Sequence, residues 1–489
     1  TYDMALTDSK RWLLLLTVGA GLLLITLYNS VLYTALPTLT RELHATATQG
    51  LWIINAYPLV MAGLLLGAGT LGDRIGHRRI FLIGLMLFGL ASLLAAFAPT
   101  PEFLIGARAF LAVGAAAMMP ATLALISVTF ENERERNIAI AIWGSLSVIG
   151  AALGPIVGGF LLGHFWWGSV FLINVPVVMI AFVATLFVAP KIAGDPSKPW
   201  DIVSSLQALV ALSALVIAIK ETAHAGSSWV TIALALGVSI VASIVFVRRQ
   251  LRMPYPLLDF SIFKNKAFLS GTFAAAFSLF AIGGVELATT QRFQLVAGFS
   301  PLEAGLLVSV AALGSLPTAL LGGAFLHGVM ITAYGLSNGL GWLILGLGVM
   351  GAGVGACMSV ASTAIMGNAP AHRAGMASSV EEVSYEFGSL FAVTILGSLL
   401  AYLYTIGVQL PENAPALARE SMAAAVDFAK DDPSGGASLR AAANTAFDSA
   451  YTTVLYVAAG VLAAGAMVTA TLLRKYGPGS ESSSYSTGH

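Results

Sequence analysis

Charged residues are scarce in this chain. Asp, Glu, Lys and Arg make up 10% of its 489 residues, against roughly 25% in soluble domains. Hydrophobic residues reach 57% and the mean hydropathy is +0.85, which is more apolar surface than a soluble chain can bury. This composition excludes a soluble globular protein and predicts an all-α integral membrane protein.

Other absences exclude whole classes of function. The net charge is zero, so nothing indicates a nucleic-acid partner. Cys357 is the single cysteine, which excludes an internal disulfide and a cysteine-rich metal site. The histidines lack metal-ligand spacing, and no phosphate loop, catalytic triad or dinucleotide fingerprint is present. We therefore expect neither an enzyme nor a protein with a bound cofactor or metal.

Long apolar segments recur along the chain, and a span needs about 20 apolar residues. Fourteen candidates lie near 12–35, 51–71, 80–98, 103–128, 137–163, 168–189, 202–219, 229–247, 267–291, 302–325, 329–340, 341–366, 374–404 and 451–473. The eleventh is too short to cross, so the region 325–341 is either a broken helix or incomplete. Lys10 and Arg11 lead directly into the first segment, without a separate signal peptide.

Basic residues predict the orientation, because cytoplasmic loops carry the excess of Lys and Arg. They cluster in alternate loops, which favours an even number of spans with both ends inside. The predicted divisions are a tail at 1–11, a six-helix bundle at 12–189, two extra helices with basic linkers at 190–266, a second bundle at 267–473 and a tail at 474–489. The long outer loop near 405–450 is either a solvated connector or a lid over the outer mouth.

One helix combines residues that are poor for a helix in water. Gly150, Gly154, Pro155, Gly158 and Gly159 stand within a run that has no charged residue from 137 to 188. An interior Gly costs about 1 kcal/mol and an interior Pro about 3. In a bilayer, small residues let two helices approach closely, and neighbours compensate the bond that Pro removes. We expect close packing and bending here.

Three ordered motifs resemble the major facilitator superfamily. The loop Gly69-Thr-Leu-Gly72-Asp73-Arg74-Ile-Gly76-His77-Arg78-Arg79 is similar to that superfamily's signature between spans two and three, with His77 at a usual Arg. Arg108 resembles its intramembrane Arg, although an Arg snorkelling to an interface is the alternative. The Gly150–Gly159 run resembles its antiporter motif.

The segment from Trp167 to Pro176 resembles one found in the superfamily's 14-span members, and the overall resemblance is to drug:proton antiporters of the QacA/SmvA type. The resemblance implies two six-helix bundles with two extra central helices, in the inner membrane. It also implies export of lipophilic cations, such as quaternary ammonium biocides and dyes, driven by the proton gradient.

Acids within spans fit that function, because carboxylates attract cations and can exchange protons. Glu381, Glu382 and Glu386 stand in the thirteenth span, with Tyr385 as a possible hydroxyl partner. A later helix start would instead leave Glu381 and Glu382 at the interface. Glu286 in the ninth span either lines the path or pairs with Arg292.

Two positions depart from the resembled pumps. Tyr28 stands where their first span carries Asp, and Asn55 stands where the second span often carries Asp. Neither residue supplies a fixed negative charge at neutral pH. Tyr28 offers an aromatic face or marks altered coupling, and Asn29 beside it is the alternative polar group. Tyr57 and Trp143 share spans with the motifs and are candidate aromatic contacts, although packing is the more common role.

These observations predict a proton-coupled efflux antiporter that acts as a monomer in the lipid bilayer, on cationic small molecules and protons. The alternatives are an exporter of a neutral or anionic metabolite or lipid, or a coupling-impaired variant. A membrane enzyme would need a nucleophile and base together, and a receptor would need a signalling domain. The sequence offers neither of these features.

Overall fold

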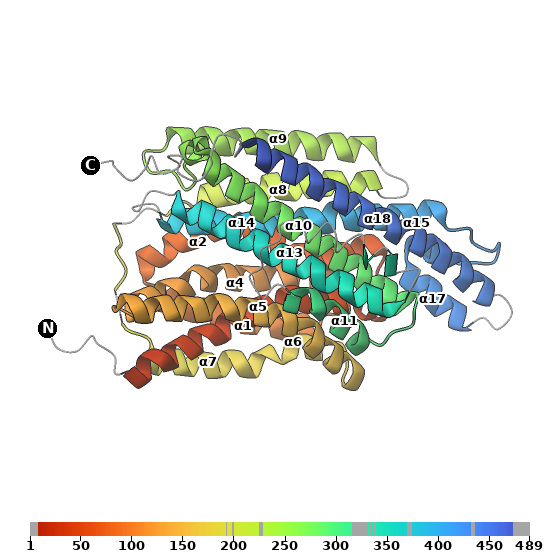
Figure 1. The fold of residues 1–489 in the computed structure, drawn as a ribbon, viewed down its shortest axis with the longest axis horizontal. Helices are drawn as coiled ribbons and strands as arrows, with labels where there is room; N and C mark the ends of the chain where they lie inside the picture. The colour runs from red at the N-terminus through yellow and green to blue at the C-terminus, as the bar shows by residue number, and fades with distance from the viewer. Residues whose placement is uncertain are drawn as a thin grey trace.

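The computed structural model describes residues 8–191, 193–197, 200–223, 228–314, 331–332, 334–335, 339–368, 374–431 and 436–472. Within these ranges every regular element is a helix and none is a strand. The helices run mostly along the long axis of the molecule (Figure 1). The predicted all-α fold is therefore confirmed.

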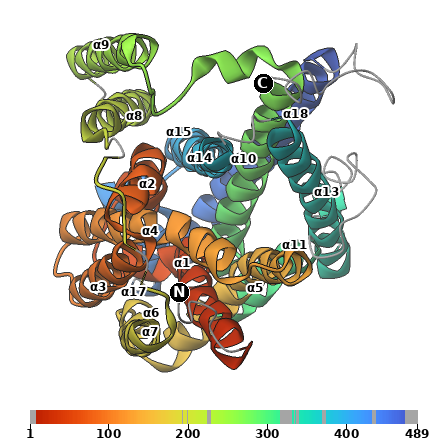
Figure 2. The same cartoon turned by 90° about the vertical axis from the view of Figure 1, so that its left-hand side faces the viewer.

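The helices form two bundles and a separate hairpin. Figure 2 shows the first bundle on one side, α10, α13 and α18 on the other, and α8 and α9 at the periphery beside α2. The first bundle contains α1 (Asp8–Glu42), α2 (Ala47–Ile75), α3 (His77–Ala96), α4 (Pro101–Thr129), α5 (Glu133–His164), α6 (Ser169–Leu172) and α7 (Asn174–Val188).

The hairpin contains α8 (Ile202–Ala223) and α9 (Trp229–Arg252), and the 3₁₀ turn η1 (Phe260–Lys264) follows it. The second bundle contains α10 (Lys266–Leu295), α11 (Pro301–Gly314), α13 (Leu340–Gly367), α14 (Ala374–Phe391), the π-helical turn η3 (Ala392–Gly397), α15 (Ser398–Gly407), α16 (Ala416–Glu420), α17 (Met422–Asp431) and α18 (Gly436–Leu472).

Polar residues set where several helices begin. Thr46 and Gln49 form a capping box at the start of α2, and Thr100 caps α4 directly before Pro101. Asn132 and Asn265 cap α5 and α10 through backbone N–H groups of the first turn. Each side chain satisfies donors that a helix start leaves without partners. These caps fix the helix ends at the two faces of the bundle.

Ten helices within the described ranges are long and apolar enough to cross a membrane. Three shorter apolar stretches belong to α5, α11 and α13: Ile149–His164, Pro301–Val310 and Leu340–Gly353. Most of the irregular region 325–341 and the tails 1–7 and 473–489 lie outside the described residues. The count of fourteen spans therefore stays a prediction. The start of α1 and the end of α18 lie toward the same end of the molecule (Figure 1), as an even number of crossings requires.

The glycines of α5 permit the close packing that the sequence predicts. A Cβ at Gly150, Gly154 or Gly158 would collide with Thr26, Ser30 or Val31 of α1. A Cβ at Gly159 would collide with the backbone of Leu302 in α11, and Gly305 of α11 lies against the Pro155 carbonyl. One edge of α5 therefore packs within the first bundle, and the other edge packs across the boundary between the bundles.

The loop motif ends α2 and starts α3 in one residue. Gly76 has φ 101°, a conformation that other residues rarely adopt, and its N–H donates to the Gly72 carbonyl at 2.9 Å. His77 Nε2 lies 3.3 Å from Asp73 Oδ1, and Arg78 Nη2 donates to the Leu186 carbonyl at 3.1 Å. The motif therefore ties the ends of three helices of the first bundle together.

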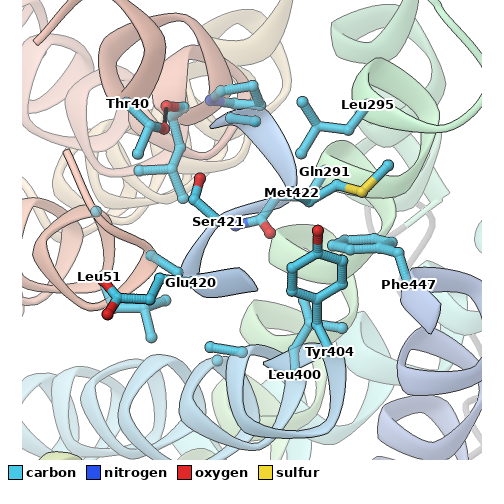
Figure 3. A pocket seen from close by; sticks show the side chains of 17 residues that line it. Thr40, Leu51, Gln291, Leu295, Leu400, Tyr404, Glu420, Ser421, Met422 and Phe447 are labelled. Atoms are coloured by element: carbon cyan, nitrogen blue, oxygen red, sulfur yellow. Dashed lines mark hydrogen bonds between the residues drawn. The ribbon is translucent and has the colours of Figure 1, made fainter. Parts of the chain in front are cut away.

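The central part of the predicted outer loop forms a lid. Ala418, Met422, Ala425 and Val426 are buried, and Tyr404 OH donates to the Ala418 carbonyl at 2.7 Å. In Figure 3 the segment Glu420–Met422 lies between Thr40 and Leu51 of the first bundle and Leu400, Tyr404 and Phe447 of the second. The cavity left beside it is only about 40 Å³. A freely solvated connector is wrong for this segment.

Candidate functional site

Arg108 is a buried cation in the first bundle. Its side chain is 1% exposed, and α4 aims it at the backbone of α2. Its Nε donates to the Ile53 carbonyl at 3.1 Å, Nη2 donates to the Ile54 carbonyl at 3.5 Å, and Cζ lies 4.8 Å from the centre of the Tyr57 ring. Backbone dipoles and a π face thus compensate the charge. The alternative of an Arg snorkelling to the interface is wrong.

Glu386 is the most buried of the three clustered acids in α14. It is 9% exposed and interacts electrostatically with Arg108 and Glu382. Gly388, half a turn further on, packs against Ala276 and Leu279 near the middle of α10. This contact places Glu386 close to the mid-depth of the bundle, facing the first bundle.

Glu381 and Glu382 lie about 6–8 Å closer than Glu386 to the start of α14, at 1.5 Å per residue. This start lies at the end of the molecule that carries the basic loops. Both acids are half-buried, and Tyr385 OH donates to Glu381 Oε1 at 3.0 Å. Since α14 already begins at Ala374, a later helix start is wrong. The three acids therefore form a ladder that leads from one face toward mid-depth.

Glu286 is half-buried on α10, where Gly283 and Gly284 pack directly against η3. Its suggested pairing with Arg292 does not form, because Arg292 Nε lies 3.0 Å from Asp448 Oδ1 of α18. The hydroxyl of Tyr33 of α1 lies 3.3 Å from Ser389 Oγ of α14 and 3.6 Å from where a Cβ would stand at Gly283 of α10. Tyr33 thus contacts both helices, three residues from Glu386 on α14 and three residues from Glu286 on α10.

Sequence reasoning did not select Tyr33. Its partner Ser389 is 356 positions away along the chain, so no local pattern marks the contact. The same is true of Thr394, whose Oγ1 accepts a hydrogen bond of 2.5 Å from Asn55 Nδ2. Asn55 is fully buried, and this bond joins α2 directly to η3. Thr394 stands in a π-helical turn, an arrangement that often marks functional sites.

Tyr28 and Trp143 lie apart from the acid ladder. Tyr28 is fully buried, its OH donates to the Val170 carbonyl at 2.9 Å, and its ring packs against Phe88 and Phe171. Trp143 Nε1 donates to Thr122 Oγ1 at 3.0 Å, which joins α5 to α4. Both contacts lie within the first bundle, so these two side chains have packing partners of their own.

Six polar atoms near the boundary of the two bundles share one property. Each is buried without a hydrogen-bond partner among the described residues, and such atoms are rare unless water or a ligand meets them. They are Thr34 Oγ1, Asn55 Oδ1, Tyr57 OH, Arg108 Nη1, Thr290 Oγ1 and Glu386 Oε2. They come from α1, α2, α4, α10 and α14. The arrangement can hold water, a proton or a polar ligand between the bundles.

Comparison with known proteins agrees with this architecture. Residues 18–329 match the Major Facilitator Superfamily. The chain is 36% identical to the multidrug efflux pump LfrA of Mycolicibacterium smegmatis, covering 96% of this chain and 97% of LfrA. It is 35% identical to the methyl viologen resistance protein SmvA of Salmonella typhimurium, covering 93% and 96%.

Solved structures share the fold at low identity. A bacterial homologue of the human lysosomal transporter Spinster aligns with a TM-score of 0.68 and 15% identity, over 96% of this chain and all of the other. A peptide transporter aligns with a TM-score of 0.57 and 18% identity, over 94% and 95%. The fold, the motif packing and the relatives together show that the chain is a multi-pass membrane transporter, not an enzyme, and belongs to the Major Facilitator Superfamily.

Proposed function

We propose that this transporter exports lipophilic cations in exchange for protons by alternating access. Glu386 carries the proposal: it is a buried acid near mid-depth, faces the other bundle and has one carboxylate oxygen without a partner in the described chain. A carboxylate in such a place binds either a proton or an organic cation, because each neutralises the buried charge.

The other parts of the site support the same function. Glu382 and Glu381 offer successive acidic positions toward the start of α14, and Tyr33 offers an aromatic ring, whereas the Tyr57 ring already lies against Arg108. Cation–π attraction and carboxylate charge require no fixed hydrogen-bond geometry, which suits varied substrates. The relatives named multidrug efflux pump and methyl viologen resistance protein favour cations as substrates, since methyl viologen is an organic dication.

The glycine-lined contacts of α5 supply a route for the motion. Gly159 and Gly305 bring the α5 and α11 backbones together across the bundle boundary. Two helices that meet through their backbones can slide or rock against each other, because no interdigitated side chains have to separate. We therefore propose that the contact between α5 and α11 moves during transport and that the proton gradient supplies the energy.

Export of an anion is the second candidate, and it would depend on Arg108. Two of the Arg108 nitrogens already donate to carbonyls of α2, and its face lies on Tyr57. Only Nη1 is left for a ligand within the described site. An anionic substrate would also meet three acids on α14, which disfavours this candidate.

The test is uptake of a cationic dye into everted vesicles under an imposed pH gradient. Glu386→Gln keeps the shape of the side chain but cannot release a proton, so we expect gradient-driven transport to fall at least tenfold. The matched control is Glu131→Gln, which removes an exposed acid and should leave the rate unchanged. A normal rate with Glu386→Gln would refute the proton role of this residue.

A further inference from the structure

The hairpin α8–α9 takes no part in the site described above. Of the 24 residues of α9, only Ile232, Ser239 and Gln250 are buried. Ser239 Oγ donates to the Ala211 carbonyl of α8 at 2.9 Å, and α9 lies at the outermost corner of the molecule (Figure 2). Most of α9 therefore faces whatever surrounds the protein.

A groove of about 690 Å³ runs between the two helices of the hairpin. All but one of its lining side chains are apolar: Val203, Leu206, Gln207, Val210, Ala233, Leu234, Gly237, Val238, Val241, Ala242 and Val245. From Ala233 to Val245 the groove follows α9 for twelve residue steps, about 18 Å. One leaflet of a bilayer has a hydrocarbon depth of roughly 15 Å. The groove thus matches one leaflet rather than the full membrane.

The groove ends at basic side chains. Arg252 lies seven residues after Val245, so it continues the same stripe of α9, and Arg248 lies close beside that stripe. Both side chains are exposed. They stand on the side that carries the excess of Lys and Arg, which is the cytoplasmic side of a membrane protein. Two positive charges therefore lie beyond the end of the apolar groove, about 5 and 10 Å past Val245 along α9.

The neighbouring Arg249 already forms an ion pair. Its Nη2 lies 3.0 Å from Asp201 Oδ1 and its Nε donates to Asp201 Oδ2 at 3.3 Å. Burial raises the pKa of the Asp201 carboxyl, but the hydrogen bonds from Arg249 and Ser204 outweigh burial and hold that pKa below its ordinary value. Asp201 thus remains ionised and paired with Arg249, while no ion pair of Arg248 or Arg252 is found within the described part of the chain.

We propose that the α8–α9 groove binds one anionic phospholipid of the inner leaflet, with an acyl chain along Leu206 and Val241 and the phosphate between Arg248 and Arg252. The apolar lining fits a hydrocarbon chain, and the paired arginines fit a phosphate that carries net negative charge. A helix of a second copy would need an apolar contact surface through both leaflets, and it would not account for the two arginines.

The experiment is native mass spectrometry of the intact purified protein, titrated separately with phosphatidylglycerol and phosphatidylcholine of the same acyl chains. We expect tighter binding of phosphatidylglycerol. Arg248→Ala combined with Arg252→Ala should weaken it about thirtyfold and abolish the preference, because each basic residue contributes about 1 kcal/mol at an anionic surface and 1.4 kcal/mol is tenfold. The matched control is Arg134→Ala with Arg136→Ala, at the inner end of α5.

A second pair of variants tests the groove itself. Gly237 lines the groove with open space beside it, so Gly237→Leu should fill the groove and weaken both lipids. Ser243→Leu, on the opposite face of α9, should weaken neither. Equal binding of the two lipids by the unmodified protein would overturn the headgroup site. Unchanged binding by Gly237→Leu, or a dimer that this variant dissociates, would overturn the acyl-chain site.

Discussion

At the scale of single residues, Tyr28 decides how far the family resemblance extends. The resembled pumps carry Asp at this position, but here the hydroxyl donates to the Val170 carbonyl and the ring packs against Phe88 and Phe171. Position 28 therefore serves packing in this chain, whereas the Tyr57 ring and the Ile53 and Ile54 carbonyls compensate the charge of Arg108.

This role of Tyr28 makes a prediction for two variants. Tyr28→Phe loses one buried hydrogen bond and should lower the free energy of unfolding by about 1 kcal/mol. Tyr28→Asp removes a fully buried aromatic ring and should cost at least about 3 kcal/mol, with slower dye efflux. Denaturation midpoints and transport in vesicles would measure both. Faster efflux by Tyr28→Asp would mean that Arg108 needs a carboxylate partner and that the chain as it stands is impaired.

The sequence predicts some site residues and misses others for one physical reason. Arg108 and Glu386 are detectable because a charge inside an apolar span is costly and therefore conspicuous. Tyr33 and Thr394 carry no charge, and tyrosine and threonine are common in spans. Their importance comes from partners in the other bundle, Ser389 and Asn55, which only the folded arrangement brings near.

At the scale of elements, the packing of α5 was predictable in kind but not in partner. Five small or kinking residues indicate close approach to some helix. The structure shows two neighbours: α1 on the side of Gly150, Gly154 and Gly158, and α11 on the side of Gly159. Spacing alone cannot identify these partners, because the residues that both helices bring to the contacts lie more than a hundred positions away along the chain.

The close approach predicts opposite effects at two glycines of α5. Gly154→Ala would drive a methyl group into Ser30 and the Leu27 carbonyl of α1, whereas Gly163 has open space around it. We expect Gly154→Ala to lower the denaturation midpoint and transport clearly. Gly163→Ala should be neutral or stabilise by up to about 1 kcal/mol through helix propensity. Equal effects of the two variants would contradict the packing role of Gly154.

At the scale of the whole molecule, the sequence does not decide whether the outer loop is a connector or a lid that closes the outer face. The segment Glu420–Met422 lies between the bundles, and Tyr404 and Thr405 hold it by hydrogen bonds to the Ala418 and Arg419 carbonyls. A polar, alanine-rich loop gives no sign of this burial, because the side chains around the segment come from α1, α2, α10, α15 and α18.

The lid predicts how a thiol at its centre would react. In a Cys357→Ser background, Ser421→Cys replaces a residue that is 3% exposed. It should react slowly with a membrane-impermeant maleimide added outside. Adding Tyr404→Ala removes the bond to Ala418 and should raise the labelling rate at least tenfold. Glu412→Cys, on the exposed part of the same loop, supplies the fully reactive control. Rapid labelling of Ser421→Cys alone would show that the lid is not closed in solution.

The all-α membrane fold follows from composition and apolar length, and the structure confirms it for the residues that it describes. The predicted division into two bundles and two extra helices follows from apolar length and the placement of basic residues. The count of fourteen spans stays a prediction, because the eleventh apolar segment is short and most of it lies outside the described residues. Its weak signal is a matter of length: twelve residues of helix extend about 18 Å, which is too little for a bilayer.

Helix α2 carries contacts of four kinds along its length. Asn55 bonds to η3, the Ile53 and Ile54 carbonyls hold Arg108, Tyr57 supplies the aromatic face, and Gly72 to Gly76 turn the chain into α3. Because one helix joins them, a substitution that shifts α2 would change several of these contacts together. Laboratory evolution toward a new drug should therefore find few single gains on α2, and those it finds should trade substrate range against turnover.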